Sequence, residues 1–484
     1  MGVALRTCGG FGARAWLVRL GRGPRRPIAP HAPAPTRTSP ADYDAVFMAN
    51  TRLTSRAAAW VVQWGPILPL LVAEFILWTG FGALLPVMPL YFTEHGVPIA
   101  LLGVVIAAWP AARLITEPLF GMLADRTARV PLMVGGLVLA AASVGSMALW
   151  ASPVAFIALR ALSGLGTAMY DPAARGYLTD ATPAERRGEV FGLYNAAQQG
   201  GILLGPAIGG LGTALAGGYQ FVLVFSAVMT ILAAIAVATR VRELRGPHAE
   251  PFPALGLSEF PGGPMPETGP GTTAADLLAQ PSSSTPPAAG VQPRSLRNRF
   301  ILAAVLVNMA GYFGGGLYET IWGLFVLDRG GSVVLVGATF ATFGLTTVLV
   351  SPIGGRIVDR RGPYPFVVGG LLVMVVTMLI YPFSPTFLYI PLVAIEAIGF
   401  SFLGPATYTV IARGTPVGQS STAQGLVGSA GTVGTIVAAL ATGVLAAIDL
   451  NAPFFAGAAV IAILLVVVLA SSGRLLRSMR PILP

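Results

Sequence analysis

Residues 201–210 read GILLGPAIGG, and they lie inside an apolar stretch long enough to cross a bilayer. Glycine lets a neighbouring helix approach at backbone distance, while Pro206 removes one helical hydrogen bond and bends the helix. A soluble helix would rarely carry this combination, because Gly costs about 1 kcal/mol and Pro about 3 kcal/mol in a helix interior. Neighbouring helices in a membrane can satisfy the freed backbone groups, so the stretch predicts a closely packed membrane span.

The composition is that of a protein that crosses the bilayer several times. The 484 residues are 54% hydrophobic and 10% charged, whereas about 25% of the residues in a soluble globular protein are charged. All 30 basic residues are arginines, and they are placed very unevenly along the chain. The net charge of +10 therefore does not indicate a nucleic-acid partner.

Residue types that carry chemistry at a fixed site are scarce. The chain has one cysteine, Cys8, in the N-terminal tail. A single cysteine excludes an intramolecular disulfide and a cysteine metal cluster. The three histidines, His31, His95 and His248, fall in predicted loops or tails. We find no nucleophile–base pair and no phosphate-binding loop, so the sequence predicts neither an enzyme nor a cofactor or metal site.

Twelve stretches have the roughly 20 apolar residues that a spanning helix needs. The expected spans are 66–92, 98–120, 131–151, 153–173, 189–214, 218–239, 300–327, 333–353, 364–383, 386–411, 424–447 and 453–472. We therefore predict an all-α polytopic membrane protein. Its expected parts are a disordered basic tail (1–62), a six-helix bundle (63–240), a flexible cytoplasmic linker (241–298), a second six-helix bundle (299–473) and a C-terminal tail (474–484).

Composition supports the assignment of the linker and of the N-terminal tail as segments outside the bundles. The stretch from Pro247 to Pro293 is dominated by Pro, Gly, Ser, Thr and Ala, which bury too little apolar surface to fold alone. The N-terminal tail has no apolar run of membrane length, so we expect no cleavable signal there.

The two halves of the chain repeat each other. Several residues recur at an offset of 234, including Gly103 and Gly337, Pro118 and Pro352, Asp125 and Asp359, and Arg126 and Arg360. At an offset of 233, Pro172 matches Pro405 and Pro183 matches Pro416. An offset held through several loops indicates duplication of a six-helix unit.

Arginine predicts the orientation in the membrane. With the N-terminus in the cytoplasm, arginines cluster in every inner loop, in the linker and beside both termini, whereas the outer loops contain only Arg329. This asymmetry is what the positive-inside rule expects of a cell-membrane protein with both termini cytoplasmic.

Two inner loops carry the same charged pattern. Its residues are Gly121, Asp125, Arg126 and Arg129 in the first half, and Gly355, Asp359, Arg360 and Gly362 in the second. An aspartate at this position can cap a neighbouring helix or pair with a base at the membrane surface.

Three patterns resemble signatures of the major facilitator superfamily, in particular its 12-helix drug:proton antiporters. The charged loops resemble G-x3-D-R-x-G-R/K, although Ala128 stands where glycine is usual. Arg160 and the following Ser163-Gly164-Leu165-Gly166 resemble the fourth-helix signature. The fifth-helix signature G-x3-G-P-x2-G-G matches Gly201, Gly205, Pro206, Gly209 and Gly210.

The resemblance implies two six-helix bundles with a substrate site between them near the midplane. It also implies that the charged loops latch the halves together in the outward-open state. Family members of this type export small compounds in exchange for protons by alternating access.

The charged residues within predicted spans include Glu74, Arg160, Glu319 and Glu396. A charge at such depth costs at least about 2.5–3.5 kcal/mol on insertion scales, so each must face a cavity or a partner. We expect Glu74 to be the proton site, with Glu396 and then Glu319 as the next candidates. The resemblance implies that Arg160 tunes the proton site or helps to shape the cavity, and a structural ion pair between helices is the alternative.

Two more charged residues, Arg113 and Glu117, are four apart in the second span and share a helix face, so we expect them to pair. We assign that pair to the latch and not to the substrate site. Aromatic residues within spans are candidates to line an apolar cavity: Trp78, Phe81, Trp109, Tyr194, Tyr312, Phe313 and Trp322.

The sequence therefore predicts a monomeric secondary transporter that exports apolar or cationic compounds, a drug or a metabolite, in exchange for protons. Its expected partners are a small-molecule substrate, protons and the lipid bilayer. A proton-coupled uptake symporter for a small nutrient or metabolite would have the same fold and is the alternative. A receptor or scaffold of this fold is a third possibility.

The orientation can be tested with reporter fusions. A reporter placed after Glu94 is expected outside and one placed after Glu259 inside, because the first follows an outer span end and the second lies in the linker. Protease accessibility or alkaline phosphatase activity would measure the side, and the same side for both fusions would contradict the predicted topology.

Overall fold

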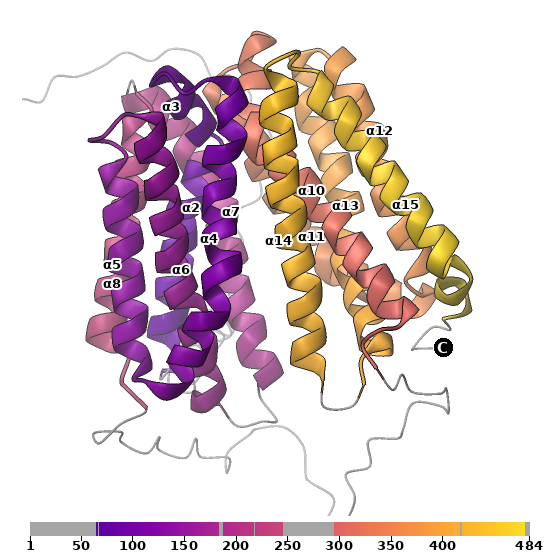
Figure 1. Cartoon of the computed structure of the whole chain (residues 1–484), viewed down its shortest axis with the longest axis horizontal. Coiled ribbons are helices and arrows are strands. Elements are labelled where there is room, and N and C mark those ends of the chain that lie inside the picture. The colour runs from indigo at the N-terminus through magenta and orange to yellow at the C-terminus, as the bar shows by residue number, and fades with distance from the viewer. Residues whose placement is uncertain are drawn as a thin grey trace, which may run out of the picture. The chain divides into compact units, whose positions relative to one another are not determined.

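The computed structural model of the chain describes residues 64–65, 67–182, 187–216, 218–244, 295–416 and 419–479, and within them the secondary structure is entirely helical (Figure 1). The first half comprises α2 (Leu68–Leu84), α3 (Met88–Glu94), α4 (Ile99–Arg126), α5 (Arg129–Ser146), α6 (Pro153–Ala181), α7 (Arg187–Ala216) and α8 (Gln220–Arg240). The second comprises α10 (Arg299–Asp328), α11 (Val333–Arg361), α12 (Tyr364–Ile380), the short 3-10 helices η2 (Tyr381–Phe383) and η3 (Thr386–Leu388), α13 (Tyr389–Gly414), α14 (Ser420–Ala446) and α15 (Ala452–Ser478). The expected all-α membrane fold is confirmed.

Within the described residues, ten helices are long and apolar enough to cross a bilayer, or eleven if α2 and α3 are counted as one broken span. These two helices meet at a bend of 46°, between Leu84 and Met88, where Pro86 and Pro89 interrupt helical hydrogen bonding. The remaining expected span is α7, whose 30 residues reach about 45 Å at 1.5 Å per residue. It carries Asn195, Gln198 and Gln199, and it is not among the helices identified by length and composition. The count of twelve spans is therefore not directly confirmed.

Most of the expected tail 1–62 and linker 241–298 lies outside the described residues. At the other end of the chain, α15 continues to Ser478, past the expected end of its span at Ser472.

The two halves have matching internal contacts. In the first half, α2 packs on α7 and α8, α6 on α4 and α5, and α5 on α8. In the second, α10 packs on α14 and α15, α13 on α11 and α12, and α12 on α15. Each pair in one half corresponds to a pair in the other, as expected from duplication of a six-helix unit. We call these units the N-bundle (α2–α8) and the C-bundle (α10–α15).

The bundles contact each other mainly through two helix pairs, α4 with α14 and α7 with α11, and α10 makes smaller contacts with α3 and α4. We call the end of the bundles that carries the α3–α4 and α10–α11 connections the outer end, after the orientation that the arginines predict. Gly103 of α4 packs against the backbone of Ala439 and Leu440 of α14 near this end. Gly210 of α7 packs in the same way on α11, where a Cβ would lie 3.0 Å from the Gly337 Cα.

The glycines of 201–210 fit α7 between α2 and α11. Gly201, Gly205 and Gly209 follow one another at four-residue spacing and face α2. A Cβ at Gly201 would lie 2.6 Å from the carbonyl oxygen of Phe75, and one at Gly205 would lie 2.6 Å from the backbone nitrogen of Ala83. No side chain fits at these positions, so the segment does act as a close packing face.

Replacing Gly205 by leucine is expected to separate α7 from α2 and to destabilise the N-bundle by at least about 1–3 kcal/mol, the usual cost of overpacking. Gly369→Leu is the matched control, because a Cβ at Gly369 of α12 meets no atom within 4 Å. Thermal unfolding in detergent measures both. A Gly205→Leu protein as stable as the control would contradict the packing described here.

Candidate functional site

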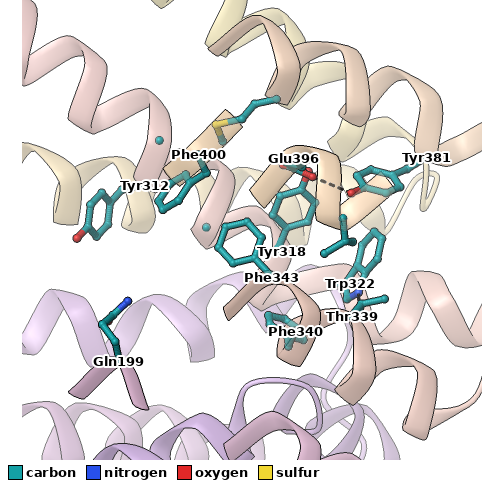
Figure 2. Close-up of a pocket in the computed structure, with 14 residues that line it drawn as sticks. Gln199, Tyr312, Tyr318, Trp322, Thr339, Phe340, Phe343, Tyr381, Glu396 and Phe400 are labelled. Atoms are coloured by element: carbon teal, nitrogen blue, oxygen red, sulfur yellow. Dashed lines mark hydrogen bonds between the residues drawn. The ribbon is translucent and has the colours of Figure 1, made fainter. Parts of the chain in front are cut away.

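A cavity of about 320 Å³ lies on the side of the C-bundle that faces the N-bundle (Figure 2). This volume is within the range of small-molecule sites. Four elements of the C-bundle line it together with η2, and Gln199 of α7 contributes from the N-bundle. The lining residues are Gln199, Gly311, Tyr312, Gly315, Tyr318, Trp322, Thr339, Phe340, Phe343, Met374, Tyr381, Val393, Glu396 and Phe400.

Glu396 is the acidic residue of this lining, and its side chain is almost completely buried in α13. The hydroxyl of Tyr318 donates to its Oε1 at 2.8 Å, and the hydroxyl of Tyr381 donates to its Oε2 at 2.7 Å. Figure 2 shows the carboxyl group between these two rings. Each carboxylate oxygen thus has a neutral donor, which stabilises the group without cancelling its charge.

Aromatic rings surround this carboxyl group. Trp322 contacts Tyr318 and Tyr381 edge-on, with ring centroids 5.6 Å and 4.8 Å away, and its indole nitrogen donates to Thr339 Oγ1 at 2.8 Å. Phe343 and Phe400 form another pair, 5.3 Å apart. Ring faces attract cations, and the attraction is strongest where water is excluded. An aromatic cavity with one carboxylate suits a flat or bulky organic cation.

Glu74 lies elsewhere, fully buried in α2 and outside the lining of this cavity. Its Oε1 accepts from the Trp78 indole nitrogen and its Oε2 from the Tyr170 hydroxyl of α6, both at 2.8 Å. Our first candidate for the proton site is thus held inside the N-bundle by two neutral donors.

Arg160 does not pair with Glu74. Its Nη2 lies 3.2 Å from Glu319 Oε1 and 3.3 Å from the carbonyl oxygen of Ile106. Since Arg160 is on α6 and Glu319 on α10, this ion pair joins the two bundles. The arginine side chain is 2% exposed and the glutamate side chain 20% exposed, so little solvent screens the pair. Among our interpretations of Arg160, this geometry agrees with the ion pair between helices.

Arg113 pairs with Glu117 at 3.1 Å, as their spacing predicts, and it also pairs with Asp171 of α6. The guanidinium lies over the Trp109 ring, 4.9 Å from its centroid. Sequence reasoning missed Asp171, although a carboxylate followed by Pro172 inside an expected span was a signal for it. This cluster connects α4 to α6, so the described pairs lie within the N-bundle.

A stripe of glycine and aromatic residues on α10 was another signal that the sequence offered for this cavity. Gly311, Gly315, Tyr318 and Trp322 are three or four residues apart and therefore share one helix face. Of the aromatic candidates, Tyr312 and Trp322 line the cavity, while Trp78 and Trp109 contact charged groups of the N-bundle.

The first charged loop is tied to its own bundle. Arg129 lies 3.1 Å from Asp180 of α6 and 3.7 Å from Asp125, and it is buried although Asp125 is 76% exposed. The backbone nitrogen of Val130 donates to Glu243 at 2.8 Å. These contacts join α4, α5 and α6 to the end of α8, so the role of the loop as a latch between the bundles stays a prediction.

The second copy explains why Ala128 is tolerated in the first. Gly362 ends α11 with a φ of +78°, a conformation that favours glycine, and its nitrogen donates to the Val358 carbonyl at 2.8 Å. Ala128 is at the equivalent position, but it precedes α5 with a φ of −62° and a ψ of 132°. Any residue adopts that extended backbone, so the first loop does not need a glycine there.

The family profile of the Major Facilitator Superfamily matches residues 70–327 and 298–477 of this chain. Among curated proteins, the quinolone resistance protein NorA of Staphylococcus aureus is 29% identical over 136 residues, which is 28% of this chain and 35% of NorA. The staphyloferrin B transporter of the same organism is 32% identical over 177 residues, 36% of this chain and 42% of that protein. The matches thus span less than half the length of these relatives.

Solved structures share the fold at low identity. A bacterial homologue of the human lysosomal transporter Spinster, in an inward-facing and occupied conformation, has a TM-score of 0.64 and 15% identity, covering 85% of this chain and 96% of that one. The nucleoside transporter NupG has a TM-score of 0.63 and 13% identity, covering 84% and 98%.

The pair between the bundles makes a prediction about stability. Replacing Glu319 by glutamine is expected to leave the buried Arg160 charge uncompensated. This should lower the free energy of unfolding by about 3 kcal/mol. The double variant Arg160→Met/Glu319→Gln removes both charges and should be more stable than the single variant. Thermal unfolding of both proteins in the same detergent measures the difference. A single variant at least as stable as the double variant would show that the two groups do not pair.

Proposed function

The chain belongs to the Major Facilitator Superfamily of membrane transporters, and on that premise we propose that it exports organic cations in exchange for protons. The observation that carries the proposal is the aromatic cavity with the buried Glu396 carboxyl group in its wall. The protein is a multi-pass membrane transporter and not an enzyme. We further propose that it acts as a monomer in the cell membrane with both termini in the cytoplasm.

The cavity supports a cationic, largely apolar substrate. Rings of Tyr318, Trp322 and Phe343 offer apolar area and π faces, and the carboxylate supplies the one buried negative charge of the lining. An anionic substrate would meet that charge with no arginine in the described lining. Export is supported by the relative named for quinolone resistance and by the glycine and proline pattern of α7.

The two buried carboxyl groups suit two parts of an exchange. Glu396 lines the cavity, so a cation and a proton can compete for the same carboxylate. Glu74 lies between α2 and α6 outside that lining, and we propose that it carries a proton through the cycle. A substrate that binds only one protonation state shifts the equilibrium between them, which is the coupling an exchanger needs.

The ion pair between Arg160 and Glu319 connects this chemistry to the motion of the bundles. Because the pair joins α6 to α10, it must break when the bundles separate at the outer end. A proton on Glu319 removes one charge of the pair and so lowers the cost of separation. This proposal replaces the expectation that Arg160 acts directly on Glu74.

Proton-coupled uptake of a small nutrient or metabolite remains the alternative function, since the names staphyloferrin B transporter and nucleoside transporter, carried by other proteins with this fold, state no direction of transport. The direction of coupling separates the two. With an antiporter the cell loses substrate as protons enter, whereas with a symporter the cell gains substrate as protons enter.

Ethidium efflux from cells that lack their own pumps tests the proposal, measured with and without a protonophore. We expect the parent protein to clear ethidium only with an intact proton gradient. Glu396→Gln is expected to slow efflux of the cation at least tenfold, because the amide cannot compensate the substrate charge. Glu74→Gln is expected to stop efflux driven by the proton gradient while leaving the binding of neutral compounds. The control is Glu94→Gln, which alters an exposed residue at the end of α3.

Normal pumping by Glu74→Gln would assign that residue a structural role, and normal pumping by Glu396→Gln would contradict the cation site. Ethidium accumulation driven by the proton gradient would favour the symporter.

A further inference from the structure

Exposed arginines gather at the inner end of the C-bundle, which is the end opposite the outer end. The helix termini meet there: Ser472 of α15 donates to the carbonyl oxygen of Arg299 at the start of α10, and Asn298 donates to the carbonyl oxygen of Gly414 at the end of α13. Among the described residues at this end, Asp359 is the one acid. The exposed arginines include Arg297, Arg299, Arg360, Arg361, Arg474 and Arg477.

The inner end of the N-bundle keeps acids beside its arginines. Arg129 is paired with Asp180 and Asp125, and Glu243 follows the end of α8. The Oε2 of Glu243 accepts from the backbone nitrogen of Val130 in the first turn of α5, at 2.8 Å. A carboxylate at that place offsets the partial positive charge of the helix start. The positive-inside rule explains arginines on both bundles, but it does not explain why only one of them keeps its acids.

In the C-bundle, a cation takes the place of that carboxylate. Arg477, in the last turn of α15, lies over the ring of Tyr364, the first residue of α12, 4.7 Å from its centroid. Its Nη2 donates to the Tyr364 hydroxyl at 2.5 Å. The N-cap of α12 is Pro363, and no described side chain accepts from the first turn of this helix. Because guanidinium groups and free first-turn N–H groups both bind anions, this site lacks the anion that its counterpart contains.

The apolar outside of α15 leads to the same site. Ile463 and Val466 are 61% and 63% exposed. Ala470, Arg474 and Arg477 follow them at intervals of three or four residues, so all five residues share one helix face. Arg474 lies about 12 Å beyond Val466 along the helix axis. An acyl chain packed on the apolar part of this face would therefore bring its headgroup to the two arginines.

We propose that the inner ends of α12 and α15 bind the phosphate of an anionic phospholipid in the inner leaflet. Arg474 and Arg477 contact the phosphate from α15, and the first turn of α12 faces it with free N–H groups. The lipid thus supplies the negative charge that Glu243 supplies in the N-bundle. A headgroup with net negative charge suits this basic surface better than a zwitterionic one, whose ammonium group offsets the phosphate.

The first test compares the full chain in two kinds of lipid nanodisc with the same acyl chains. One contains only phosphatidylcholine and the other also contains phosphatidylglycerol. Phosphatidylglycerol is expected to raise the midpoint of thermal unfolding by about 3 °C, since a ligand that binds the folded state stabilises it. Equal midpoints in the two kinds of nanodisc would overturn the proposal. The same rise produced by inorganic phosphate in phosphatidylcholine nanodiscs would overturn it too, because a soluble anion would then be sufficient.

The second test locates the site with matched variants. Arg474→Gln/Arg477→Gln should weaken phosphatidylglycerol binding roughly 30-fold, as expected for two arginines at a membrane surface. Titration of the detergent-solubilised protein with this lipid, followed by native mass spectrometry, measures the affinity. The control is Arg126→Gln/Arg240→Gln, which removes the same charge from exposed positions at the inner end of the N-bundle and should change the affinity little. Equal losses in both variants would show diffuse attraction by positive charge and no site on α12 and α15.

A charge reversal tests the comparison between the bundles. Arg477→Glu would give the C-bundle a carboxylate like that of Glu243. We expect this variant to be as stable in phosphatidylcholine as the parent is with phosphatidylglycerol, and to gain nothing from the anionic lipid. A variant that still depends on phosphatidylglycerol would contradict the proposed site. None of these measurements needs a substrate or a proton gradient, so failure of ethidium efflux would leave them unaffected.

Discussion

Close approach between helix backbones is the constraint on which the other features of this protein depend. Lipid is as apolar as a leucine side chain, so burial of apolar surface alone cannot hold these helices together. Glycine permits contact at backbone distance, and it does so both between α7 and α2 and where the bundles meet. The cavity, the buried carboxyl groups and the ion pair between bundles all take their positions from those contacts.

The two halves bury a carboxyl group in related but exchanged ways. In the N-bundle, Glu74 of the first helix accepts from Tyr170 of the fourth. In the C-bundle, Glu396 belongs to the fourth major helix and accepts from Tyr318 of the first. The same helix pair thus carries an acid and a phenol in both halves, with the partners reversed. Only the C-bundle pair lines the cavity, so the two halves differ in whether their acid lies in its wall.

Two arginines at membrane depth, Arg113 and Arg160, have different kinds of partner. Arg113 is compensated by Asp171 and Glu117 within the N-bundle. Arg160 is compensated by Glu319 of the other bundle, so any separation of α6 from α10 lengthens this ion pair. The Arg113 cluster therefore stabilises one bundle, whereas the Arg160–Glu319 pair depends on how the two bundles lie against each other.

The sequence by itself determined the helical fold, its duplication and the close packing face of α7, because apolar length, repeat offset and glycine spacing are local properties of the chain. It also identified Glu74, Glu396, Glu319 and Arg160 as charges inside apolar spans, where any charge must find a cavity or a partner. It could not assign the partners. Which carboxylate Arg160 meets, that Asp171 pairs with Arg113, and which acid lines the cavity depend on how helices distant in sequence are rotated about their axes. Only the tertiary structure decided that rotation, because the packing of each helix face against its neighbours fixes it.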